Sequence, residues 1–167
     1  SVLMVVTSHG RIDDQHPTGL WFEEFAVPFK MFREHGFRVT VASPKGGAVP
    51  NDPRSEPKDK NTSDTKAALD TLKNTKELRS VNPAAFDAMF VPGGHGTMYD
   101  LANNPTLTKY IGYYAQRDKV IGSVCHGPAS FIGATRADGA PLVMNRRVTA
   151  FTTAEERAVG LDGRMAF

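Results

Sequence analysis

The sequence predicts an α/β fold with a mostly parallel central sheet. Short apolar, β-branched runs alternate with segments whose apolar residues recur every three or four positions. Strands that alternate with helices in this way form right-handed βαβ crossovers, which place helices on both faces of the sheet. The expected architecture is therefore a three-layer sandwich of the flavodoxin-like kind.

Five segments are predicted to form buried strands, because each is apolar, rich in β-branched residues and bounded by Gly, Pro or polar residues. They are residues 1–8 (SVLMVVTS), 37–43 (FRVTVAS), 86–94 (FDAMFVPGG), 119–125 (KVIGSVC) and 146–152 (RRVTAFT).

The first predicted helix covers residues 20–36. Aromatic side chains recur at spacings of three or four from Trp21 to Phe32, which is typical of a helix with one buried face. Gly36 follows at the position where a left-handed residue commonly ends a helix.

A second helix is predicted over residues 104–118, with Asn104 as its N-cap and Pro105 at its first position. A further helix begins near Thr153.

The length of 167 residues suits one domain over residues 1–167, and there is no internal repeat. Residues 44–64, PKGGAVPNDPRSEPKDKNTSD, are too polar for a core and long for a connection, which predicts a lid or binding loop. The chain stops soon after the helix near Thr153 begins, so we expect more chain to follow in the natural protein.

The composition excludes several classes of partner. The formal net charge is only +2 and the basic residues are scattered, so no nucleic-acid or anionic-membrane surface is indicated. No apolar run approaches the roughly 20 residues that span a bilayer. A single cysteine cannot form an intrachain disulfide and fits a reducing compartment, so a cytoplasmic protein is expected.

Two turns at predicted strand ends carry the chemically suggestive residues. Ligands of open α/β sheets bind beyond the carboxyl ends of the strands. One turn holds the adjacent Gly93 and Gly94, whose amides can approach and bind an oxyanion. The other holds Cys125 at a strand-to-helix junction, where a helix N-terminus favours the thiolate and lowers the thiol pKa. The sequence thus predicts a nucleophilic Cys125 with the His126 N–H facing the oxyanion. The simpler alternative is an inert, buried cysteine.

Glu24 borders the apolar stripe of the first predicted helix. Pro28 lacks the N–H that would pair with the carbonyl of residue 24, which predicts a distorted turn at that carboxylate. An active-site carboxylate is one interpretation, and a solvated surface glutamate is the alternative that periodicity alone favours.

Glu156 has two interpretations as well. In the segment TAEE, Thr153 as N-cap and Glu156 at the third helical position form a capping box. A second role, orienting an imidazole, is compatible with it.

The five histidines show no i, i+4 helical pair of a zinc motif, so no metal site is predicted. His95 lies in the glycine turn, and His9 and His16 follow the first strand.

The motifs GGHGT (residues 93–97) and VCHGPA (124–129), together with the early GLWFEEFAVPF (19–29), resemble the ThiJ/PfpI superfamily, within it the glyoxalase III and heat-shock chaperone branch. The resemblance covers essentially the whole chain. It implies a fold like that of class I glutamine amidotransferases, a homodimer, and no cofactor. Family members usually continue past the end of this chain, and the larger branch has a metal site in an added domain that is missing here.

The resemblance also implies the roles of particular residues. Cys125 is expected to be the nucleophile, His126 its triad histidine and Glu24 the helix glutamate that hydrogen-bonds the thiol. Glu156 matches the acidic third member of the triad, and Gly94 and His126 are expected to supply the oxyanion N–H groups.

The expected activity is a lyase reaction of the D-lactate dehydratase kind, in which methylglyoxal-type 2-oxoaldehydes become 2-hydroxy acids through a cysteine hemithioacetal. Hydrolysis as a cysteine peptidase or amidase is the alternative among enzymes. A glutaminase needs a distant histidine–glutamate pair, and the last histidine here is His126. Two other classes remain: a stress-induced holdase chaperone and a redox sensor.

Overall fold

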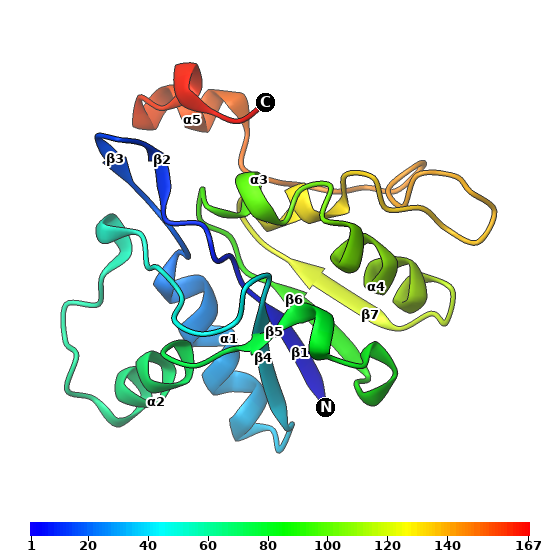
Figure 1. The fold of residues 1–167 in the computed structure, drawn as a ribbon, viewed down its shortest axis with the longest axis horizontal. Helices are drawn as coiled ribbons and strands as arrows, with labels where there is room; N and C mark the ends of the chain where they lie inside the picture. Colours follow the sequence, from blue (N-terminus) through cyan, green and yellow to red (C-terminus); the bar gives the residue numbers. More distant parts are fainter.

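The computed structural model describes residues 1–167 and has a five-stranded parallel sheet in the order β5-β4-β1-β6-β7 (Figure 1). The strands are β1 (Val2–Val5), β4 (Val39–Ser43), β5 (Lys76–Glu77), β6 (Ala88–Val91) and β7 (Val120–Ser123). The predicted α/β fold is confirmed, although the short edge strand β5 falls in a segment with no strand pattern.

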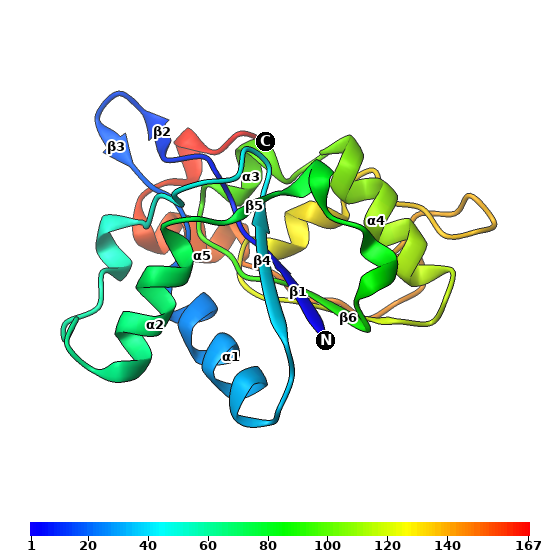
Figure 2. The same cartoon turned by 60° about the horizontal axis from the view of Figure 1, so that its bottom comes forward.

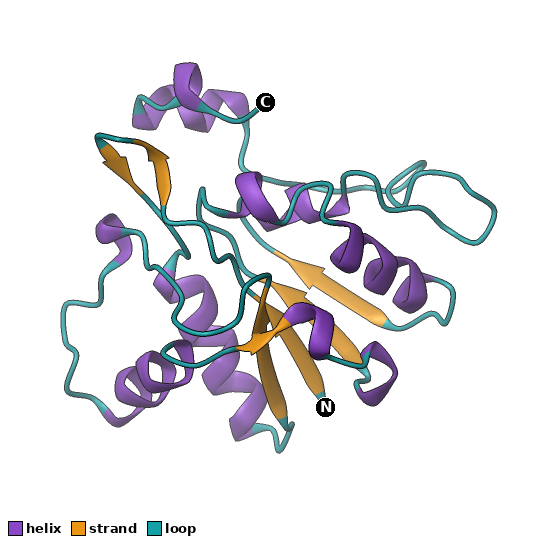
Figure 3. Ribbon diagram, in the orientation of Figure 1, coloured by secondary structure: helices purple, strands orange, loops and turns teal.

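Helices cover both faces of the sheet, as Figures 2 and 3 show. Helices α1 (Phe22–Glu34) and α2 (Ser63–Leu72) pack on one face, and α4 (Pro105–Ala115) packs on the other. Strand β1 is buried on both sides because its side chains alternate between the two cores. One core contains Leu3, Val5, Leu107 and Ile111, and the other contains Val2, Met4, Phe25 and Phe29.

The two main predicted helices are present. Helix α1 continues through Pro28, and Gly36 adopts the left-handed conformation with a φ of 78° just after the C-cap. At the start of α4, the Asn104 side chain accepts hydrogen bonds from the N–H groups of Thr106 and Leu107, each 3.1 Å long.

The smaller elements mostly lie around the carboxyl ends of the strands. Strands β2 (Arg11–Asp13) and β3 (His16–Pro17) form an antiparallel hairpin, and α3 (Thr97–Asp100) and α5 (Thr153–Val159) are short helices. Five 3-10 turns complete the fold: η1 (Pro53–Ser55), η2 (Leu78–Ser80), η3 (Pro83–Ala85), η4 (Gly127–Phe131) and η5 (Asp162–Arg164). None of the helices has the length and apolar composition that crossing a bilayer requires.

The strand predicted over residues 146–152 is wrong. This segment has no regular structure, and its Phe151 N–H donates to the Cys125 carbonyl, in the turn after β7, at 2.9 Å. Val148 is 61% exposed, so no neighbouring strand buries the β-branched side chains of the segment. A β-branched, apolar pattern leads to a strand only where a neighbouring strand provides hydrogen-bond partners for its backbone N–H and C=O groups.

Candidate active site

The turns that follow β6 and β7 lie against each other beyond the carboxyl end of the sheet. The Ser123 hydroxyl and the Val124 N–H both donate to the Val91 carbonyl, at 2.9 and 3.3 Å. The Thr97 hydroxyl is 3.0 Å from the His126 carbonyl oxygen, to which it donates. The glycine turn after β6 and the Cys125 turn after β7 therefore form one site, at the edge where ligands of parallel sheets bind.

Cys125 occupies a sharp, strained turn. Its φ is +57°, a conformation that costs a residue with a side chain about 1–3 kcal/mol. The turn directs the half-buried side chain toward His126, whose Nδ1 lies 3.1 Å from the cysteine Sγ. The element that follows is η4, a five-residue 3-10 turn rather than the predicted α-helix.

Gly93 allows Glu24, Cys125 and His126 to pack around one point. A β-carbon at Gly93 would lie 2.7 Å from both the Cys125 β-carbon and the Glu24 Oε2, and 2.8 Å from the His126 backbone nitrogen. Those distances are too short for any side chain. The Gly93 N–H instead donates to the Glu24 Oε2 at 2.8 Å. Adjacent Gly94 has a φ of +97°, which favours glycine.

The predicted lowering of the thiol pKa is wrong. Burial raises the pKa of Cys125 to about 12, and the negative charge of Glu24 raises it further, which outweighs the Gly94 and His126 N–H groups that face the sulfur. A helix N-terminus was expected to stabilise the thiolate, but one 3-10 turn has only a small dipole. Cys125 therefore rests as a thiol, and a nucleophilic role would need a base that removes its proton.

Glu24 and His126 both contact the Cys125 thiol and are both candidate bases. Glu24 is half-buried on the first turn of α1, and burial raises the pKa of its carboxyl group. His126 is 6% exposed, and burial lowers the pKa of its imidazole despite the hydrogen bond to Glu156. A neutral imidazole has a free nitrogen lone pair, so the His126 Nδ1 can accept the thiol proton.

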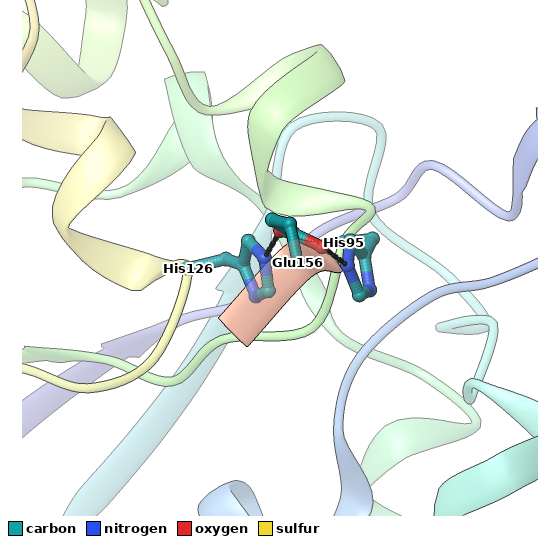
Figure 4. A group of neighbouring side chains, drawn as sticks. All are labelled: His95, His126 and Glu156. Carbon is teal, nitrogen blue, oxygen red and sulfur yellow. Dashed lines mark hydrogen bonds and ion pairs between the residues drawn. The ribbon is translucent and has the colours of Figure 1, made fainter. Parts of the chain in front are cut away.

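Glu156 holds His126 from helix α5, as Figure 4 shows. The His126 Nε2 donates to the Glu156 Oε1, and the carboxylate is 6% exposed. The capping box predicted on Thr153 and Glu156 is displaced by one residue, since Thr152 is the N-cap and Glu155 its partner. The displacement leaves the Glu156 carboxylate free of the cap and turned inward. Burial raises the Glu156 pKa, but hydrogen bonds from His126 and His95 outweigh burial and hold it below 4.5.

Three further residues, which no sequence motif identified as part of the site, form hydrogen bonds that continue from Glu156. His95 donates from Nε2 to the Glu156 Oε2 at 2.9 Å, and the Arg54 Nη2 lies 3.0 Å from the His95 Nδ1. Arg54 in turn forms two hydrogen bonds with Asp52, at 2.9 and 2.7 Å. The loop 44–64 therefore reaches the site through Asp52 and Arg54. The only sequence signal was the place of His95 in the glycine turn.

His95, His126 and Glu156 are also the group whose ligand atoms could hold a metal ion, since those atoms lie within 4.8 Å of one another. Each imidazole N–H is directed at its own carboxylate oxygen, so the three side chains satisfy one another as donors and acceptor. A cation would have to displace both hydrogen bonds.

The DJ-1/PfpI family model matches residues 21–163. The glutathione-independent glyoxalase HSP31 of Saccharomyces cerevisiae is 33% identical, with 96% of this chain and 72% of that protein aligned. The crystal structure of glyoxalase III from Candida albicans has a TM-score of 0.86 at 29% identity, covering 97% of this chain and 72% of that one. The Francisella tularensis Rapid Encystment Protein 24 KDa has a TM-score of 0.91 at 32% identity, covering 99% and 76%. With a matching sequence model, a shared fold and a cysteine turn at the sheet edge, the chain belongs to the DJ-1/PfpI family.

Proposed function

We propose that this protein is a glutathione-independent glyoxalase that converts 2-oxoaldehydes such as methylglyoxal into 2-hydroxy acids without a cofactor. Relatives named glutathione-independent glyoxalase align with 96% and 98% of the chain. The observation that carries the chemistry is that the Cys125 thiol contacts two bases, Glu24 and His126, and faces two backbone N–H groups. That set of groups suits addition to an aldehyde followed by proton transfer.

In the first step, the Cys125 sulfur adds to the aldehyde carbon and forms a hemithioacetal. The His126 Nδ1, 3.1 Å from the sulfur, takes the thiol proton and passes it to the aldehyde oxygen. The Glu156 carboxylate stabilises the imidazolium that exists between the two transfers. The N–H groups of Gly94 and His126, which face the sulfur, stabilise the developing oxyanion by about 3 kcal/mol each.

In the second step, a proton moves from the former aldehyde carbon to the neighbouring carbonyl carbon. We assign it to Glu24, which removes the proton from the first carbon while His126 moves the hydroxyl proton of that carbon to the ketone oxygen, giving an enediolate. Glu24 then returns the proton to the second carbon, and the product is a thioester of the 2-hydroxy acid. Because burial raises the Glu24 pKa, this carboxyl group can both accept and return a proton.

In the last step, water hydrolyses the thioester. The neutral His126 activates the water, the hydroxyl oxygen bonds to the thioester carbon, and the carbon–sulfur bond breaks. The sulfur recovers a proton from His126, so the cycle starts again from the thiol. Neither a reductant nor an oxidant is consumed, because one carbon is oxidised and its neighbour reduced within the same molecule.

The test is the formation of lactate from methylglyoxal by the wild-type protein and by Cys125→Ala and Cys125→Ser. Both variants are expected to lose turnover with a melting temperature close to that of the wild type, because neither adds volume at the half-buried position. Retained turnover in a folded Cys125→Ala protein would overturn the proposal. Hydrolysis of peptide or amide substrates by a wild type that makes no lactate would favour the hydrolase alternative.

Two features bear on the remaining alternatives. A redox sensor needs an acidic thiol, and burial raises the Cys125 pKa, which disfavours that role. Exposed apolar side chains such as Val120 and Val148, 67% and 61% exposed, suit a holdase or a homodimer interface. Protection of a client protein against aggregation by Cys125→Ala would show a chaperone function separate from catalysis. The homodimer, the lid function of residues 44–64 and the cytoplasmic location stay predictions.

A further inference from the structure

We infer that His95 is a positioning residue for this site, and that Arg54 and Asp52 of the loop 44–64 hold His95 in the tautomer that the site requires. The inference rests on the proposed function only for the expected effect on kcat and KM. Its structural content is a continuous chain of hydrogen bonds from Asp52 through Arg54, His95, Glu156 and His126 to the Cys125 thiol.

The hydrogen bond from Arg54 fixes the tautomer of His95. A guanidinium group has donors only, so the His95 Nδ1, 3.0 Å from the Arg54 Nη2, must carry a lone pair. The proton of the neutral ring then lies on Nε2, which donates to the Glu156 Oε2 at 2.9 Å.

Glu156 in turn fixes the tautomer of His126. One carboxylate oxygen accepts from the His95 Nε2 and the other from the His126 Nε2, so the carboxylate cannot rotate without losing one bond. With its proton held on Nε2, His126 presents the Nδ1 lone pair to the Cys125 thiol at 3.1 Å. In the opposite tautomer an N–H would face the thiol, and His126 could not accept its proton.

The far end of the chain is anchored in the protein. Asp52 is fully buried and accepts two hydrogen bonds from the Arg54 guanidinium, at 2.9 and 2.7 Å. It also accepts one from the Arg54 backbone N–H at 2.9 Å and one from the Thr18 hydroxyl at 2.8 Å. The Asp52 N–H donates to the Leu20 carbonyl at 2.9 Å. Although the Arg54 side chain is 41% exposed, its two-pronged contact with a buried carboxylate gives it a fixed direction.

The experiment compares His95→Leu with His95→Gln. Leucine removes both hydrogen bonds, whereas the glutamine amide can donate to Glu156 and accept from Arg54. Arg54→Met removes the hydrogen bond that sets the tautomer and the two side-chain hydrogen bonds to Asp52, but it keeps the bond between His95 and Glu156. Matched controls are His35→Leu on the exposed end of α1 and Arg38→Met, an exposed arginine outside the site. The readouts are the ¹⁵N chemical shifts of the His126 imidazole and the kcat and KM for methylglyoxal.

For His95→Leu we expect kcat to fall roughly 10- to 100-fold, the usual worth of a hydrogen bond to a charged group. KM should stay within about threefold, because His95 acts on the base and does not touch the substrate. The ¹⁵N shifts should change from those of a single Nε2–H tautomer to those of a mixture. His95→Gln should restore most of both signals, Arg54→Met should give a smaller change of the same kind, and the controls should match the wild type.

An unchanged His126 spectrum and an unchanged kcat in a folded His95→Leu protein would overturn the inference. If His95→Leu does not fold, Arg54→Met decides the question, and an unchanged His126 spectrum in that variant has the same consequence. A wild-type protein without methylglyoxal turnover would contradict the proposed function, but the spectra would still support or overturn the role of His95.

Discussion

Replacing Glu24 with glutamine is predicted to make the Cys125 thiol more acidic. Glutamine keeps the carbonyl oxygen that accepts the Gly93 N–H at 2.8 Å, so the turn around Gly93 should be preserved. The substitution removes the negative charge that, after burial, is the second cause of the raised thiol pKa. The change is therefore electrostatic, with almost no change in volume.

The magnitude follows from the geometry around Gly93. The Glu24 Oε2 and the Cys125 β-carbon both lie 2.7 Å from the same point, the position of a β-carbon on Gly93. Two unit charges about 5 Å apart interact by roughly 3 kcal/mol at an effective dielectric constant near 20. Without that interaction the thiol pKa should fall from about 12 to roughly 10.

The assay is the rate of alkylation by iodoacetamide as a function of pH. At pH 8 a pKa lower by about two raises the thiolate fraction about 100-fold. The thiolate of a more acidic thiol is also a weaker nucleophile, which reduces the net gain in rate to about tenfold. Glu23→Gln, on the exposed neighbouring residue, is the matched control and should react like the wild type.

Turnover of methylglyoxal should change in the opposite direction. If Glu24 moves the proton between the two substrate carbons, Glu24→Gln loses that base and about 10²–10⁴-fold in rate, the usual contribution of general acid–base catalysis. Faster alkylation with slower turnover would separate the two effects of the carboxylate. Alkylation no faster than in the wild type would refute the electrostatic reasoning.

Four further predictions concern packing, helix capping and pH. Gly93→Ala should lower the free energy of unfolding by about 1–3 kcal/mol and abolish activity, because its methyl group would overlap Cys125, Glu24 and His126. Gly112→Ala should raise the free energy of unfolding by about 0.5–1 kcal/mol, and with it the melting temperature, because the new methyl group meets only the Thr135 carbonyl at 3.5 Å. Asn104→Ala should cost about 1 kcal/mol in urea unfolding, since α4 loses its N-cap. Hydrogen bonds from His126 and His95 outweigh burial and lower the Glu156 pKa in the folded protein. Ionised Glu156 therefore stabilises the fold above pH 4.5. This contribution is lost as the pH falls through the pKa of the folded state. Urea unfolding of Glu156→Gln should therefore depend less on pH around 4.5 than that of the wild type, and equal slopes would contradict the assignment.

The sequence predicted those parts of the fold that local patterns determine. The apolar strands and the caps at Asn104 and Gly36 depend on neighbouring residues in the chain, and the structure has them. The predicted strand over residues 146–152 failed because its β-branched pattern says nothing about a partner for its backbone. The capping box moved by one residue because TTAEE offers two threonines and two glutamates in the same order, and only tertiary contacts choose between them.

Local patterns located the candidate site at two recognisable turns, and the family resemblance added the helical residues Glu24 and Glu156. Cys125 and the glycine turn are both at strand ends, where the parallel fold brings them together. His95, Arg54 and Asp52 are contributed by two loops that no periodicity relates, and their contact appears only in three dimensions. The thiol pKa depends on burial and on the distance to Glu24, which lies a hundred residues earlier in the chain, and neither is visible in the local motif.

A thiol that keeps its proton at neutral pH is compatible with the proposed chemistry. Addition to an aldehyde needs a proton on the new oxygen, and the Cys125 thiol supplies it through the His126 Nδ1 at 3.1 Å. The thiolate of a weakly acidic thiol is also the stronger nucleophile once it forms. Between turnovers the protonated sulfur resists oxidation, because the thiolate is the reactive form. In the proposed mechanism, the Glu24 carboxylate whose charge keeps the proton on the resting sulfur then acts as the base that moves the substrate proton. One carboxylate would thus serve both the resting and the reacting enzyme.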